Sequence, residues 1–174
     1  HTCTYGALGA FSSGVGSTDL GAVLATGSTW LKVPPTIRVV YEGRLGSWVG
    51  GKDLILDTLG RIGVEGATYK ALEFSGPAVN SLPMDERFTM ANMVVEGGTK
   101  NGVIAPDDTT RRYAQDRFLR EPVFFSSDPE AEVERELRVD ASAVELQVAF
   151  PHSPDNVRPV SASGTVPLDQ VFIG

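Results

Sequence analysis

Residues 36–62 read TIRVVYEGRLGSWVGGKDLILDTLGRI, and this stretch decides the fold. In its first part the apolar residues Ile37, Val39 and Tyr41 alternate with polar ones, which is the pattern of a half-buried strand. Residues 52–62 instead carry apolar side chains at helical spacing, which predicts an amphipathic helix. A strand followed directly by such a helix is typical of α/β folds.

The change between strand and helix periodicity continues on both sides of this stretch. Upstream, residues 20–26 predict a helix that ends at Gly27, with capping side chains from Ser17, Thr18 and Asp19. Downstream we expect a strand at 69–74, a helix at 83–96, a surface helix at 109–118 capped by Asp107-Asp108, an edge strand at 132–139, an extended arm after Phe150 and a buried strand at 169–173. This order predicts an α/β fold with a mixed β-sheet flanked by helices.

Length and composition indicate one globular domain. The chain has 174 residues, of which 41% are hydrophobic and 21% charged, and this is enough for one domain with its own core. We expect a single domain over residues 1–174, with a helix-rich core at 1–121 and a strand-rich return with an extended arm at 122–174. Because the chain starts at His1 rather than Met and stops within an apolar run, we expect it to be excised from a larger subunit.

Charge and cysteine content exclude several classes of protein. The 15 basic and 22 acidic residues give a net charge of -7, which would repel a nucleic-acid backbone, so no nucleic-acid partner is expected. No apolar run approaches the roughly 20 residues that span a bilayer, so no membrane partner is expected either. The single cysteine, Cys3, excludes an internal disulfide, cannot hold a metal cluster by itself and fits a reducing cytoplasm.

The expected helix at 83–96 carries two stripes of side chains. The apolar stripe is Met84, Phe88, Ala91 and Val95, and the polar stripe is Asp85, Thr89, Asn92 and Glu96. Asn92 and Glu96 are four residues apart, so an α-helix would place one above the other. Gly97-Gly98 would end the helix and leave Glu96 in its last turn, where unsatisfied carbonyls disfavour a carboxylate by about 0.3–1 kcal/mol. An acid at this position indicates a functional requirement, but the spacing alone favours an ordinary solvated face.

Other catalytic or binding patterns are weak. The chain has two histidines, His1 and His152, which leaves little material for a Ser-His-Asp triad or a multi-histidine metal site. The glycine-rich start has no G-x-x-x-x-G-K-[ST] motif, so close backbone packing explains its glycines better than phosphate binding does. A non-catalytic anion-binding or scaffold domain stays open as an alternative.

The longest motif opens the chain: His1-Thr2-Cys3-Thr4-Tyr5-Gly6-Ala7-Leu8-Gly9-Ala10-Phe11, then Gly14-Val15-Gly16-Ser17-Thr18-Asp19. Further motifs follow it in order: Gly51-Lys52-Asp53, Gly66-Ala67-Thr68-Tyr69-Lys70, Arg87-Phe88-Thr89-Met90-Ala91-Asn92-Met93 leading to Glu96, Lys100-Asn101-Gly102, Ala149-Phe150-Pro151-His152 and Asp169-Gln170-Val171-Phe172-Ile173-Gly174. Together they resemble the large subunits of the aconitase family. The Cys-Thr-Tyr after His-Thr is closer to the two-subunit isopropylmalate dehydratases and homoaconitases than to mitochondrial-type aconitase.

The resemblance implies a reaction and residue roles. Family members are hydro-lyases that isomerise a hydroxy acid by dehydration and rehydration. They use a 4Fe-4S cluster in which one iron has no cysteine ligand, and this iron binds the substrate. His1 matches the histidine that protonates the departing hydroxyl, and Glu96 matches the carboxylate that hydrogen-bonds the iron-bound water or hydroxyl. Asn92 matches an amide beside the cluster. The cluster cysteines are expected beyond Gly174, so the chain by itself should supply no metal ligand, bind no cluster and be inactive.

The same resemblance implies a set of partners. They are the remaining domains of the large subunit, a separate small subunit that provides the base for the substrate C–H proton, and a small-molecule hydroxy di- or tricarboxylate. The first hypothesis for the reaction is the conversion of 2-isopropylmalate to 3-isopropylmalate in leucine biosynthesis. The alternative is a homoaconitase of lysine biosynthesis or a related hydratase. Either enzyme would be expected in the cytoplasm.

Overall fold

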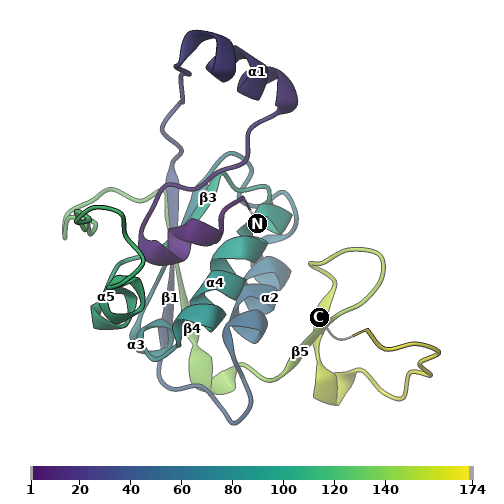
Figure 1. The fold of residues 1–174 in the computed structure, drawn as a ribbon. Coiled ribbons are helices and arrows are strands. Elements are labelled where there is room, and N and C mark those ends of the chain that lie inside the picture. The colour runs from purple at the N-terminus through teal and green to yellow at the C-terminus, as the bar shows by residue number, and fades with distance from the viewer. Residues whose placement is uncertain (1, 173–174) are drawn as a thin grey trace.

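The computed structural model describes residues 2–172, and its centre is a four-stranded sheet (Figure 1). The strands are β1 (Thr36–Glu42), β2 (Ala71–Ser75), β3 (Asn101–Ile104) and β4 (Arg135–Asp140). They lie in the order β3-β2-β1-β4, and every neighbouring pair is parallel. The expected α/β class is confirmed, and so is the edge position of the last of these strands. We expected a mixed sheet, but the four-stranded sheet is entirely parallel, and the antiparallel pair of strands forms a separate two-stranded ribbon.

Two helices cover one face of the sheet. They are α2 (Gly51–Ile62), which connects β1 to β2, and α4 (Met84–Met93), which precedes β3; Figure 1 shows them side by side in front of the sheet. The amphipathic helix expected at 52–62 is confirmed, because its Leu54 and Leu59 side chains are fully buried. The shorter helices are α3 (Pro77–Asn80), α5 (Asp108–Ala114) and the 3-10 helices η1 (Thr4–Leu8), η2 (Val94–Gly97), η3 (Ala141–Ala143) and η4 (Val160–Ala162).

Tyr41 of β1 joins the sheet to the helix layer. Its hydroxyl donates a hydrogen bond to the Leu54 carbonyl oxygen at 2.6 Å and lies 2.8 Å from the Thr58 hydroxyl of α2. Burial raises the pKa of Tyr41 far above its ordinary value, so the phenol remains a neutral donor. The core around it is apolar and includes Ile37, Val39, Leu54, Ile55, Leu59, Leu72, Phe74, Met90, Val94 and Ile104.

The other face of the sheet carries charges. Arg38 of β1 lies in register with Glu73 of β2 and Glu136 of β4. Its guanidinium pairs with their carboxylates at 3.4 and 3.9 Å. Cross-strand pairs of opposite charge stabilise a sheet by a few tenths of a kcal/mol to about 1 kcal/mol each. The helices α2 and α4 therefore cover one face of the sheet, and the row of charged side chains around Arg38 lies on the other face.

The first α-helix, α1 (Ser17–Thr26), stands away from the sheet (Figure 1). Its end is confirmed: Gly27 adopts a left-handed conformation with φ 72°, and its N–H donates to the Val23 carbonyl. The predicted capping by Ser17, Thr18 and Asp19 is wrong. These residues lie inside the first turn, because the extended residue before the helix is Gly16, which has no side chain to cap with.

The helix predicted at 83–96 forms, and its predicted apolar stripe is confirmed at Met84 and Ala91, which are buried, and at Phe88, which packs against them, but not at Val95. Val95, expected in the core, is 39% exposed, whereas Arg87, Met90 and Val94 are fully buried. The α-helix ends at Met93 and continues as the tighter 3-10 turn of η2, so side chains beyond that residue leave the α-helical stripe. Gly98, with φ 78°, closes the turn as the sequence predicts.

The chain after the sheet forms a small ribbon. β5 (Gln147–Ala149) pairs antiparallel with β6 (Val157–Pro159), so the arm expected to extend after Phe150 folds back on itself. The buried strand predicted at 169–173 is wrong for the described residues 169–172, which are exposed and form no strand; Ile173 lies outside the described residues. Within residues 2–172 no helix combines the length and the apolar character that a membrane crossing requires.

Candidate functional site

The segment that follows His1 is packed on β3 and α4. His1 lies outside the described residues, but Cys3 and η1 behind it are placed. The buried Cys3 thiol donates to the Lys100 carbonyl at 3.7 Å. A Cβ on Gly6 would lie 1.7 Å from the Gly102 carbonyl oxygen, so only glycine permits this approach. Close backbone packing thus accounts for Gly6, as the sequence favours.

Asn92 is held against this opening segment. The Thr4 hydroxyl donates a hydrogen bond to Asn92 Oδ1 at 3.2 Å. Thr4 follows His1 by three residues, whereas Asn92 lies in the last turn of α4. The structure therefore brings two motifs that are about ninety residues apart in the chain into direct contact.

Glu96 lies one helical turn further on, in η2 rather than in α4. Within the part of the chain that the structure describes, its carboxylate is exposed and makes no hydrogen bond or ion pair. The predicted stacking above Asn92 assumed a continuous α-helix, whereas the α-helix ends at Met93 and Glu96 lies in a 3-10 turn, which has a different periodicity. The Met93 sulfur is 3.0 Å from the Lys52 ammonium of α2. Glu96 and Asn92 therefore lie near the same end of α4 but in different kinds of helix.

The Asn101 side chain holds the loop that follows η1, a role that the sequence does not predict. It is 3% exposed; its Oδ1 accepts from the Ser12 N–H at 3.2 Å, and its Nδ2 donates to the Ala10 carbonyl at 3.5 Å. The Ser12 hydroxyl in turn donates to the Thr2 carbonyl at 2.5 Å. In the sequence, only the place of Asn101 in the Lys100-Asn101-Gly102 motif marks this residue, and the motif does not show that its side chain is buried.

Thr99 is a polar group without a partner near this end of α4. Its Oγ1 is the one buried side-chain nitrogen or oxygen atom in residues 2–172 that has no hydrogen-bond partner. Thr99 lies directly between Gly98, which closes η2, and Lys100, whose carbonyl accepts from Cys3. Buried polar atoms are normally satisfied, and an unsatisfied one costs about 1–3 kcal/mol. This end of the helix is therefore not optimised for stability.

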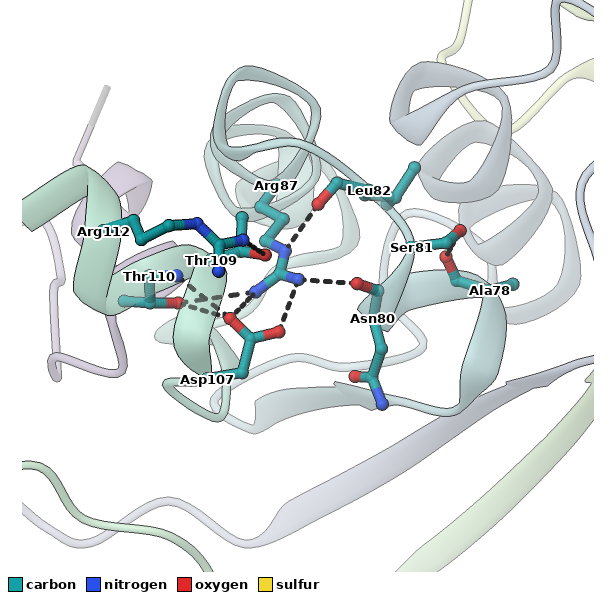
Figure 2. Close-up of polar contacts among 9 residues, drawn as sticks. All are labelled: Ala78, Asn80, Ser81, Leu82, Arg87, Asp107, Thr109, Thr110 and Arg112. Carbon is teal, nitrogen blue, oxygen red and sulfur yellow. Dashed lines mark hydrogen bonds and ion pairs between the residues drawn. The ribbon is translucent and has the colours of Figure 1, made fainter.

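At the opposite end of α4, every N–H group of the Arg87 side chain has a hydrogen-bond acceptor (Figure 2). Arg87 is 0% exposed, and all five of its N–H bonds are used: Nε donates to the Leu82 carbonyl, Nη1 to Asp107 Oδ1 and Thr110 Oγ1, and Nη2 to the Asn80 carbonyl and Asp107 Oδ2. Asp107 also caps α5 as predicted, because it accepts from the Thr110 N–H at 3.0 Å. Partial burial would raise the pKa of Asp107, but Arg87 and the Thr110 hydrogen bonds outweigh it and lower the pKa to about 2.

An open apolar groove of about 860 Å³ does not include the candidate residues. It is lined by parts of the segments 5–12 and 113–125 together with Phe88 and Pro106, and its aromatic residues are Tyr5, Phe11, Phe88, Tyr113, Phe118, Phe124 and Phe125. Neither Asn92 nor Glu96 lines it. We therefore base the site on the polar end of α4 and not on this groove.

The described residues do not form a cluster-binding site. No three His, Cys, Asp or Glu side chains within residues 2–172 gather closely enough to hold a metal ion. Cys3 is turned to the Lys100 carbonyl, and burial raises its pKa, which disfavours the thiolate that a metal requires. His152 is an exposed residue of the turn between β5 and β6. The described residues therefore offer no set of ligands for a cluster.

Comparison with known proteins gives one consistent result. The aconitase family (aconitate hydratase) matches residues 1–170. The chain is 57% identical over its full 174 residues to the 3-isopropylmalate dehydratase large subunit of Desulfatibacillum aliphaticivorans, of which it covers 42%. The corresponding large subunits of Moorella thermoacetica and Aquifex aeolicus are 56% and 51% identical over the whole chain, with 41% and 40% of their lengths covered. The chain thus spans about two fifths of the length of the curated relatives it matches.

Proposed function

The chain belongs to the aconitase family, and we propose that it is part of the large subunit of a 3-isopropylmalate dehydratase. The observation that carries this proposal is the identity of 50–57% over the entire chain to proteins of that name. The parent enzyme would convert 2-isopropylmalate to 3-isopropylmalate by removing water and adding it back at the neighbouring carbon. Residues 1–174 would form one domain of that subunit.

We assign the proposed catalytic work to one end of α4 and the segment beside it. The unpaired Glu96 carboxylate is free to accept a hydrogen bond from the substrate hydroxyl or from the water that replaces it. Asn92, held by Thr4, would fix the distance between this helix end and the opening segment. His1, which begins that segment, would protonate the departing hydroxyl.

The proposed cofactor is a 4Fe-4S cluster, which would supply a Lewis acid for the departing hydroxyl. Because the described residues contain no ligand set, we propose that cysteines elsewhere in the parent protein hold it. The relatives are named large subunits, so a small subunit is the expected partner and would complete the substrate pocket. The proposed enzyme acts in the cytoplasm.

The test is Glu96→Gln in the assembled enzyme, with Asp85→Asn as the matched control. Asp85 is an exposed acid on the same helix but at its other end. We expect Glu96→Gln to lower turnover of 2-isopropylmalate by about 10²-fold or more, with the cluster absorbance unchanged. Asp85→Asn should keep normal turnover. Near-normal turnover of Glu96→Gln would remove Glu96 from the site.

A second assay tests the substrate. The unmodified enzyme is measured with 2-isopropylmalate and with homocitrate under the same conditions. We expect a kcat/KM for 2-isopropylmalate at least about tenfold higher, since a well-placed apolar group is worth about 1–3 kcal/mol in a pocket. A preference for homocitrate would make the protein a homoaconitase, and activity with neither substrate would favour a non-catalytic domain.

A further inference from the structure

Residues 13–33 form a loop with α1 at its tip, which we call the α1 excursion. Figure 1 shows α1 at a distance from the sheet and its covering helices. None of the ten residues of α1 is buried. A Cβ built on Gly21 or Gly27 would meet no atom within 4 Å. The helix therefore has almost no packing partner among residues 2–172.

The composition of the α1 excursion does not suit a solvent-exposed helix. Residues 20–31 read LGAVLATGSTWL and contain no charged side chain, although 21% of the whole chain is charged. Its large apolar side chains are Leu20, Leu24, Trp30, Leu31 and Val33, which are 48%, 79%, 85%, 49% and 83% exposed. Contiguous apolar surface of this kind marks an interaction site.

The helix also needs a partner for its own stability. Isolated helices shorter than about 12–15 residues are marginal in water, and α1 has ten residues, one of them an internal glycine. Most helical stability in proteins comes from packing an apolar face. A partner that covers the apolar side chains of α1 would therefore stabilise the helix.

We propose that the α1 excursion packs against the remainder of its own polypeptide, outside residues 1–174. The relatives are more than twice as long as this chain, so more than half of the parent polypeptide is available as the partner. The uncharged stretch between Asp19 and Lys32 fits a permanent, core-like contact, because obligate interfaces are more hydrophobic than separable ones. This inference rests on the proposal that the chain is part of a longer large subunit, but it does not require the proposed reaction.

The test is hydrogen exchange measured by mass spectrometry on the full-length parent subunit. It is run on the subunit alone at two concentrations tenfold apart, and again with the small subunit in excess. We expect amides in residues 20–31 to exchange at least about a hundredfold more slowly than in an unstructured peptide, already in the subunit alone. Dilution and the small subunit should leave these rates unchanged. Protection that requires the small subunit, or that falls on dilution, would overturn the proposal.

A pair of variants makes the test specific. Leu24→Glu places a charge in the α1 excursion, and Leu119→Glu places one at a leucine that is 107% exposed. In the full-length subunit we expect Leu24→Glu to accelerate exchange of residues 20–31 by about tenfold or more, because a buried charge would open the contact. Leu119→Glu should leave those rates unchanged. Equal rates in the two variants would mean that Leu24 is not covered and would refute the proposal.

Discussion

The two ends of α4 are built in opposite ways. At the amino end Arg87 is buried and uses all five N–H bonds, which ties the helix to Asp107 and to two carbonyls of the preceding loop (Figure 2). At the carboxyl end the Glu96 carboxylate has no partner in the described residues, and the nearby Thr99 hydroxyl is buried without one. The amino end therefore anchors the helix, whereas the carboxyl end carries polar groups that have no partner among residues 2–172.

The strongest way to break this comparison is Arg87→Met. The substitution leaves Asp107 without its ion pair and two backbone carbonyls without a donor, so we expect a loss of about 3–5 kcal/mol in the free energy of unfolding. Urea denaturation of the parent protein measures it. The control is Arg138→Met, which removes ion pairs with Glu42 and Glu136 from a guanidinium that is 64% exposed, each worth about 0.2–1 kcal/mol. Equal losses would show that the amino end is no anchor.

Gly6→Ala tests how tightly the opening segment is attached to the carboxyl end. The added Cβ would lie 1.7 Å from the Gly102 carbonyl oxygen, and this backbone atom cannot move aside cheaply. We expect a loss of about 2–3 kcal/mol in the same urea experiment, as for overpacking of a core. The control is Gly46→Ala in the loop after β1, where a Cβ would only come within 3.7 Å of the Val49 Cγ2 atom, so stability should change by less than about 0.5 kcal/mol. A neutral Gly6→Ala would mean that η1 is loosely placed.

Acid should weaken the amino end selectively. The folded-state pKa of Asp107, about 2, lies below its ordinary value of 3.8, so its contribution is fully present above pH about 4 and is lost as the pH falls toward 2. Its side chain is 35% exposed, so solvent screening reduces the expected contribution to about 1 kcal/mol. Asp107→Asn should lack this component, and its stability should approach that of the unmodified protein at pH 2. Parallel stability curves of the two proteins from pH 5 to 2 would contradict the assignment.

The sequence predicts the scaffold better than it predicts the site. Periodicity alone places β1 and α2, because each has a single buried face that repeats at a fixed spacing. It misses the burial of Arg87, because the acid that pairs with it lies twenty residues away and no spacing links the two. It also misplaces Val95 and does not predict that the α-helix ends at Met93 and continues as the 3-10 turn that contains Glu96. The periodicity of apolar residues therefore predicts helices and strands, whereas the positions of the site residues depend on the residue at which each helix ends.

The smallest predicted effect has opposite signs at the two ends of α4. Glu96 lies where the unsatisfied carbonyls of the helical stretch point, so its negative charge is unfavourable there, and Glu96→Gln should raise stability by about 0.3–0.5 kcal/mol at low salt. Asp85 lies in the first turn, where its charge is favourable, and Asp85→Asn should lower stability by a similar amount. Thermal unfolding of the two variants at low and high salt measures both, and salt should shrink each difference. A variant that is more stable but less active would show that Glu96 is kept for chemistry, because its carboxylate has no hydrogen bond or ion pair within residues 2–172. A destabilised Glu96→Gln would instead give the residue a structural role.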